Sequence, residues 1–416
     1  MVRGKKYLVM TSTKSPLSVI LFIFISISLG LNYKLGTSGG APIYVTHLVW
    51  LCFMCGIFFL LMAKMIRVKC KLYEVLILCF LFTLLLLSSW LRSFDPADLF
   101  TTETVKYLYT LTLSVGFLVA LRYRSVNLTY IAVAVPLGVV ISTFTLVESS
   151  PFDLGRIGLA SRLDIRALGS FNVYALLVSN ALVCLIYLRS ISVGKTTIRI
   201  LILATIGYLF VVLLATLSRN GMLCFILGAL VYNYCVVDRV KFVLAAVSAL
   251  LIFSSLIIYF FNTDFGDIAA RYVVNAEFME GSGRIGVWLH LLNLMMESPS
   301  SFFFGFGVGE INFNVNGSVW EINSAHNHFL QMFYEFGMGA LLGAIFFFYR
   351  LIKSLSLIEN KYPKAFLLAV AAQLILNLFL DSTLQASQIG WFFAFWLTLL
   401  YVSGSDVIRY STKSNF

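Results

Sequence analysis

Apolar runs long enough to cross a membrane recur along the whole chain, separated mostly by short polar segments. About 20 apolar residues span the hydrocarbon core of a bilayer as a helix, whereas membrane-spanning strands give shorter segments of alternating polarity. The pattern therefore predicts an all-α polytopic membrane protein. Its twelve predicted spans are residues 16–32, 43–63, 73–91, 105–121, 127–147, 168–189, 198–217, 220–236, 240–261, 326–349, 364–381 and 387–404.

One interruption, residues 262–325, is the only large hydrophilic segment, and loops of this length are usually functional or disordered. Its many aromatic and aliphatic residues argue against disorder. The sequence at 283–298 has the pattern of an amphipathic helix, which Pro299 ends. The chain thus divides into residues 1–261 with nine spans, the loop 262–325, and residues 326–416 with three spans and a tail.

Composition supports this class, because 60% of the residues are hydrophobic and only 12% are charged. A soluble domain carries about 25% charged residues. The net charge of +11 suggests a nucleic-acid partner at first sight. With a cytoplasmic N-terminus, however, 21 of the 30 Lys and Arg fall on inside segments and 15 of the 19 acidic residues fall outside. This is the positive-inside pattern. We therefore expect both termini in the cytoplasm and no nucleic-acid partner.

Two arginines on the predicted outer face are candidate anion ligands. Arg219 lies in "TLSRNG" (216–221), the tight turn between two spans, and Arg284 opens the amphipathic helix of the long loop. An arginine at a membrane boundary is costly without a partner, although it can also snorkel to the headgroups. Two guanidinium groups on one face suit a doubly charged ligand, because arginine binds phosphate through two parallel hydrogen bonds.

A third candidate is the segment "SAHNHFLQMFYEFG" (324–337), where the long loop meets the next span. His326 and His328 suggest a metal site, but this spacing puts two rings about 200° apart on a helix and no third ligand is evident. We expect no metal. A histidine that accepts a proton near neutral pH is the better-motivated reading, with packing as the alternative. His328, Gln331 and Glu335 share a helical face and are candidate substrate-binding residues. From this face Glu335 can orient a ring or bind sugar hydroxyls.

Three stretches together resemble the family of bacterial O-antigen ligases and O-antigen polymerases. They are "ATLSRNGMLCFILG" (215–228), "GSGRIGVWLHLLNLMMESPSSFFFGFGVGEIN" (281–312) and "SAHNHFLQMFYEFGMGALL" (324–342). The pattern is an arginine turn before a span, then a glycine-arginine-aromatic helix that ends at proline. A histidine-asparagine helix with a glutamate-x-glycine sequence completes it. Each motif alone is loose, and their order, spacing and flanking spans make the set specific.

The resemblance implies a GT-C-like membrane glycosyltransferase that uses neither a metal nor another cofactor. Such an enzyme takes a glycan from undecaprenyl diphosphate at the periplasmic face of the bacterial inner membrane. By position in the motifs, Arg219 and Arg284 would bind the diphosphate, and His326 would lie next to the acceptor hydroxyl. His328 ranks below His326, because the family does not depend on it.

The resemblance leaves the acceptor open. Ligases transfer the glycan to the lipid A core, and polymerases transfer it to a second lipid-linked repeat unit, which we slightly favour. Residues 148–167 would contribute to the acceptor surface through Arg156, Arg162 and Arg166. A flippase of lipid-linked oligosaccharides is the rival class. It would carry basic residues within its spans, whereas every Lys and Arg here can be placed at a span end or in a loop.

Overall fold

The computed structural model describes most of the predicted spans and part of the long loop. The described residues are 16–31, 34–38, 41–62, 102–123, 126–145, 171–192, 195–216, 218–240, 242, 284–308, 311–315, 318–322, 325–381 and 390–413. The predicted span at 73–91 and nearly all of the span at 240–261 lie outside them.

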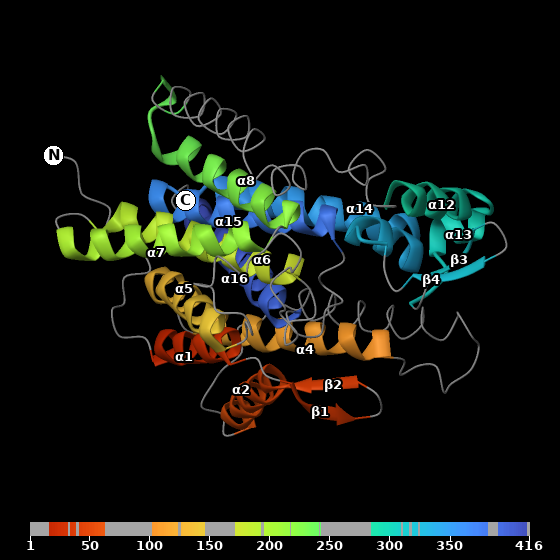
Figure 1. Ribbon diagram of the computed structural model, residues 1–416, viewed down its shortest axis with the longest axis horizontal. Helices are drawn as coiled ribbons and strands as arrows, with labels where there is room; N and C mark the ends of the chain where they lie inside the picture. Colours follow the sequence, from red (N-terminus) through yellow and green to blue (C-terminus); the bar gives the residue numbers. More distant parts are fainter. Residues whose placement is uncertain are drawn as a thin grey trace, which may run out of the picture.

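The other ten predicted spans coincide with helices, which are α1 (Pro16–Gly30), α2 (Val45–Met62), α4 (Thr102–Tyr123), α5 (Leu128–Thr145), α6 (Phe171–Ile191), α7 (Thr196–Ala215), α8 (Arg219–Val236), α14 (His328–Ser356), α15 (Lys361–Leu380) and α16 (Gly390–Lys413). Of these, α4, α7 and α15 lie along the long axis of the molecule, and α2, α5 and α16 run at an angle to it (Figure 1). Among the described helices, α4, α6, α7, α14 and α15 have the length and composition of a membrane span. The predicted class, a helical polytopic membrane protein, is confirmed.

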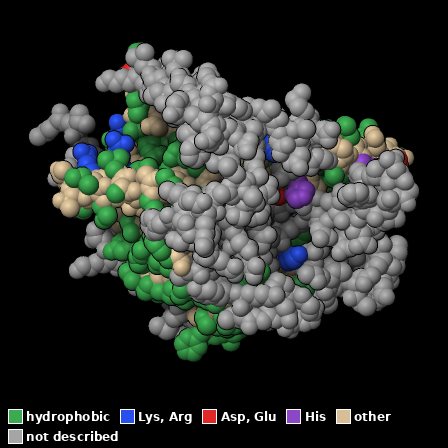
Figure 2. Space-filling view, viewed as in Figure 1, with side chains coloured by type: hydrophobic (Ala, Val, Ile, Leu, Met, Phe, Trp, Pro, Cys, Tyr) green, Lys and Arg blue, Asp and Glu red, His purple; other side chains and the backbone are tan. Residues whose placement is uncertain are grey.

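Apolar side chains lie both inside and outside this bundle, as a membrane protein requires. Inside, Trp50 of α2 is fully buried against Phe117 of α4 and Trp391 of α16, with ring centroids 4.9 and 5.0 Å away. Outside, Ile200 and Leu201 of α7 are 62% and 67% exposed. Hydrophobic side chains likewise cover much of the described surface over the bundle (Figure 2). Contact with lipid tails removes the cost that water would impose on such a surface.

Small residues let α8 approach both α6 and α15, which fixes the ends of the three helices relative to one another. A Cβ on Gly221 would lie 2.3 Å from the Cβ of Ala175, and one on Gly228 would lie 2.8 Å from Gln373. The Gln373 amide donates to the Ser179 carbonyl at 3.1 Å. Small residues and interhelical hydrogen bonds are the usual means of helix association in membranes.

The described part of the long loop lies at one end of the molecule, on the right in Figure 1. It contains α12 (Arg284–Met296), α13 (Pro299–Phe304) and the antiparallel hairpin of β3 (Ile311–Val315) and β4 (Ser318–Ile322). A second hairpin, β1 (Lys34–Ser38) with β2 (Ala41–Tyr44), precedes α2. The amphipathic helix was predicted. The two short hairpins were not, although Ile311–Val315 alternates apolar and polar residues as a strand does.

The prediction of one uninterrupted span at 326–349 is wrong, because α14 reverses direction at Gly337. That glycine has φ 78° and ψ −174°, a conformation that residues with a Cβ rarely adopt. The rings of Phe329 and Phe348 lie 5.8 Å apart, whereas a continuous helix would separate the two residues by about 28 Å. The first arm of α14 therefore folds back on the second, and only the second arm remains long enough to span.

The loop after α13 locks this reversal through backbone contacts. A Cβ on Gly337 would lie 2.2 Å from the Phe303 carbonyl oxygen, and one on Gly305 would lie 2.6 Å from the backbone of Glu335. The two N–H groups after Gly305 donate to carbonyls in the helical turn before Gly337, at N···O distances of 2.7 and 3.0 Å. Donors from the loop thus replace the intrahelical donors that a broken helix loses.

Candidate functional site

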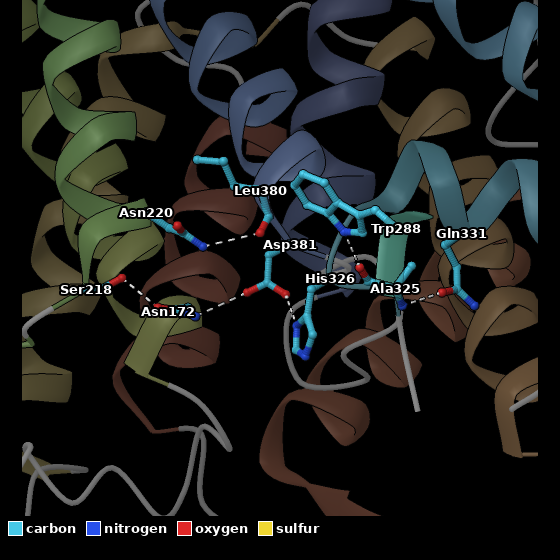
Figure 3. Close-up of polar contacts among 9 residues, drawn as sticks. All are labelled: Asn172, Ser218, Asn220, Trp288, Ala325, His326, Gln331, Leu380 and Asp381. Atoms are coloured by element: carbon cyan, nitrogen blue, oxygen red, sulfur yellow. Dashed lines mark hydrogen bonds and ion pairs between the residues drawn. The ribbon is translucent and has the colours of Figure 1, made fainter. Parts of the chain in front are cut away.

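A histidine–carboxylate pair lies where α14 begins and α15 ends (Figure 3). His326 immediately precedes Asn327, the N-cap of α14, and Asp381 immediately follows α15. The His326 Nδ1 atom lies 3.3 Å from Asp381 Oδ1, and the two side chains are 48% and 13% exposed. The imidazole ring of His326 is therefore accessible to solvent, while the carboxylate that contacts it is largely buried.

The second carboxylate oxygen of Asp381 connects the pair to α6 and α8. Asn172, at the start of α6, donates through Nδ2 to Asp381 Oδ2 at 3.5 Å. Its Oδ1 atom accepts from the Ser218 hydroxyl at 2.7 Å. Ser218 is the N-cap of α8, where its Oγ accepts from the Gly221 N–H. A run of polar contacts therefore extends from His326 to the N-terminus of α8.

Arg219 lies at this same junction, as the first residue of α8. Its two neighbours both contact residues next to Asp381: Ser218 donates to Asn172, and Asn220 donates to the Leu380 carbonyl at 3.4 Å. The arginine itself is half-buried. A helix N-terminus carries partial positive charge, so a guanidinium at that position adds to a field that favours an anion.

The backbone of His326 is strained, and its neighbours hold it. With φ 49°, His326 is the only described residue other than glycine that adopts a positive φ, a state that costs of order 1–3 kcal/mol. The Ala325 carbonyl accepts from Trp288 Nε1 at 2.8 Å, and the Ala325 N–H donates to Gln331 Oε1 at 2.8 Å. The Asn327 side chain caps α14 directly after His326. These contacts direct the imidazole towards Asp381.

Of the other predicted arginines, the structure describes only the backbone of Arg284. Arg284 is the first residue of α12, and its side chain lies outside the described part of the structure. Trp288, one helical turn later, reaches the backbone beside His326 and packs its ring on Phe379 of α15, 6.3 Å between centroids. The start of α12 is thereby tied to the site. Arg156, Arg162 and Arg166 lie outside the described residues, so their role stays a prediction.

The predicted shared face of His328, Gln331 and Glu335 is present, and it points inwards. His328 is 4% exposed, and Gln331 and Glu335 are fully buried. The Gln331 amide donates to Glu335 Oε1 at 2.7 Å, and the Tyr107 hydroxyl of α4 donates to Glu335 Oε2 at 2.7 Å. In this structure these side chains support the site from behind and do not line it.

The two histidines therefore diverge, one exposed and one buried, although His326 precedes the N-cap of α14 and only His328 is helical. Within the part of the chain that the structure describes, no group of three or more His, Cys, Asp or Glu side chains lies in an arrangement that could hold a metal ion. The absence of a metal or another cofactor from the reaction stays a prediction.

Two residues of this site were missed in the sequence, Asp381 and Asn172. Each is a polar side chain at the end of an apolar run, which is a weak signal because many spans end in this way. A stronger signal was available for Asp381, since a carboxylate at the outer end of a span is a plausible partner for a nearby histidine or arginine.

Part of the chain that contains this site matches a known protein family. A family model described as "O-Antigen ligase" matches residues 204–348, which run from α7 to α14. The matched range contains Arg219, Arg284 and His326, whereas Asn172 and Asp381 lie outside it. No curated protein matches the chain.

Proposed function

We propose that this chain transfers a glycan from undecaprenyl diphosphate to a sugar hydroxyl. The match over residues 204–348 supports this, because it relates the chain to the family of O-antigen ligases and O-antigen polymerases. The observation that supports this most directly is the exposed His326 ring, held by Asp381 at the junction that also contains Arg219. A base and an anion-binding group at one junction are what this transfer requires.

The pair assigns a role to each nitrogen of the His326 ring. Because Nδ1 faces Asp381, the Nδ1 proton can donate to the carboxylate, and Nε2 then carries the lone pair. The acceptor hydroxyl gives its proton to Nε2 as its oxygen bonds to the anomeric carbon of the donor. The bond from that carbon to the diphosphate breaks, and the diphosphate leaves with the electron pair. Attack opposite the leaving group inverts the anomeric centre.

The diphosphate is a good leaving group, so it needs charge stabilisation more than it needs an acid. Arg219 and Arg284 supply positive charge for that purpose, and the N-terminus of α8 adds its dipole. We propose Arg156, Arg162 and Arg166 as acceptor-binding residues. We propose a lipid-linked repeat unit as the acceptor, which makes the reaction a polymerisation. Ligation to the lipid A core is the alternative, and the match to an O-antigen ligase family favours it.

We place the site at the periplasmic face of the bacterial inner membrane, with both termini in the cytoplasm. Because α8 begins and α15 ends at the site, Arg239 beyond α8 and Lys361 at the start of α15 lie at the opposite end of the bundle. Figure 2 shows Lys and Arg side chains at the left end of the described surface, and others to the right beside an exposed histidine. The positive-inside rule makes the end with Arg239 and Lys361 cytoplasmic.

Reconstitution in liposomes tests the proposal. The purified protein receives an undecaprenyl diphosphate-linked glycan and either lipid A core or a second lipid-linked unit. Extension of the lipid-linked unit alone supports polymerisation, and transfer to the core alone identifies a ligase. Transbilayer movement of the donor without transfer would instead identify a flippase. With the acceptor that supports transfer, replacing Arg219 or Arg284 with Ala should lower the transfer rate at least about 100-fold without reducing membrane insertion.

A further inference from the structure

A buried run of hydrogen bonds connects α4 to the backbone next to His326. The Tyr107 hydroxyl donates to Glu335 Oε2 at 2.7 Å, and Gln331 Nε2 donates to Glu335 Oε1 at 2.7 Å. The Ala325 N–H then donates to Gln331 Oε1 at 2.8 Å. Gln331 and Glu335 are fully buried. All three contacts have the short distances of well-formed hydrogen bonds.

The order of donors and acceptors in this run determines how the Gln331 amide is turned. The Glu335 Oε1 atom accepts from Gln331 Nε2, so Glu335 takes the NH2 side of the amide. The oxygen side is then left for the Ala325 N–H, which can only donate. Gln331 satisfies both neighbours in this one orientation. Glu335 thereby acts on the backbone of Ala325, although the two residues do not touch.

We propose that Gln331 and Glu335 are positioning residues, which hold the Ala325 N–H, and with it the backbone directly before His326, so that the imidazole faces Asp381. The backbone needs such support, because His326 adopts φ 49° and this state is disfavoured for a residue with a Cβ. Trp288 holds the Ala325 carbonyl from the other side. This inference rests on the proposed function. It differs from the earlier expectation that Gln331 and Glu335 bind substrate.

Exchanging the two side chains tests the run of hydrogen bonds itself. In the double variant Q331E/E335Q, the carboxylate at position 331 accepts from the Ala325 N–H and from the new amide at position 335. That amide in turn presents its oxygen to the Tyr107 hydroxyl. Every bond of the run is kept, while the charge moves by one helical turn. In Gln331→Met, by contrast, Ala325 loses its acceptor.

Two measurements separate positioning from mere folding. We expect kcat to fall about tenfold in Gln331→Met with little change in the KM for the lipid-linked donor, and the double variant to stay within about threefold of wild type. Amide hydrogen exchange of residues 325–331 should be faster in Gln331→Met and as slow as wild type in the double variant. Gln373→Met is the matched control, because Gln373 is also buried and hydrogen-bonded but lies in α15, away from His326. It should lower the melting temperature without changing kcat.

Each outcome bears on the inference. A double variant that inserts and melts like wild type but has lost transfer would overturn it, because the carboxylate would then be needed at position 335 itself. Unchanged hydrogen exchange at 325–331 in Gln331→Met would overturn it as well. If Gln331→Met does not fold, the double variant still decides. Absence of transfer by the wild-type protein would contradict the proposed function, and the exchange measurement would still test the hydrogen-bond run.

Discussion

The surroundings of a residue, rather than its type, distinguish the two histidines of this site. His326 and His328 lie two positions apart, yet His326 is 48% exposed beside a carboxylate and His328 is 4% exposed in the interior. The positive φ of His326 and the start of α14 directly after it produce this divergence. A base that must reach a sugar hydroxyl has to be the exposed one.

Replacing Asp381 with Asn should lower kcat about 100-fold, because an amide neither fixes the Nδ1 proton nor stabilises a protonated ring. The measurement is the transfer rate of the reconstituted Asp381→Asn protein, compared with His326→Ala and with the double variant H326A/D381N. Since the two residues act as a unit, the double variant should be no slower than His326→Ala. Losses that multiply in the double variant would show that Asp381 acts independently of His326.

The residues of this site were predictable only in part. Arg219 and His326 belong to local motifs, and both lie at the junction. Asp381 is 55 residues from its partner His326 and 209 residues from Asn172, so only the packing of α6, α8, α14 and α15 brings them together. No local pattern in a single sequence contains that information.

At the scale of elements, hydropathy predicted the helices and missed the reversal of α14. The segment "FGMGALLG" (336–343) contains three glycines, and nothing local distinguishes Gly337 from Gly339 and Gly343. Only the close approach of the Phe303 backbone in α13, a helix much earlier in the chain, distinguishes Gly337, which adopts the positive φ. The hairpins were missed for a different reason, since a strand of five residues carries little periodic signal.

Alanine at position 337 should therefore be destabilising where alanine at position 339 is not. The Gly337→Ala substitution combines a disfavoured φ with a Cβ 2.2 Å from the Phe303 oxygen. We expect a loss of at least about 2 kcal/mol in unfolding free energy, and a loss of transfer with it. Gly339 is helical, and a Cβ there would meet nothing within 4 Å, so Gly339→Ala is the control. Equal melting temperatures for the two variants would contradict the reversal.

At the scale of the whole molecule, the bundle separates a basic end from an end that carries the site and the long loop. The directions of the helices produce this separation. Because α8 begins at the site and α15 ends there, the end of α8 and the start of α15 lie at the opposite end of the bundle. Charge along the sequence predicted it, because the lysines and arginines cluster in alternate loops. The structure adds that the first arm of α14 and α12 lie together at the site end, connected through Trp288.

This arrangement predicts which loops face the periplasm. Single cysteines placed at Ser300 in α13 and at Glu359 between α14 and α15 are both on exposed positions. In spheroplasts, and in a background without the native cysteines, a membrane-impermeant thiol reagent should label position 300 and spare position 359. Detergent should then expose position 359 to the reagent. The reverse pattern would place the site in the cytoplasm and exclude a periplasmic acceptor.

The central claim is that His326, held by Asp381, activates the acceptor of a glycosyl transfer. Its most direct test is the rate of glycan transfer from undecaprenyl diphosphate by the reconstituted protein and by His326→Ala, under saturating donor and acceptor. The expected result is a rate at least about 100-fold lower in the variant, with equal donor binding and an unchanged melting temperature. A His326→Ala protein that transfers the glycan at the wild-type rate would contradict the claim.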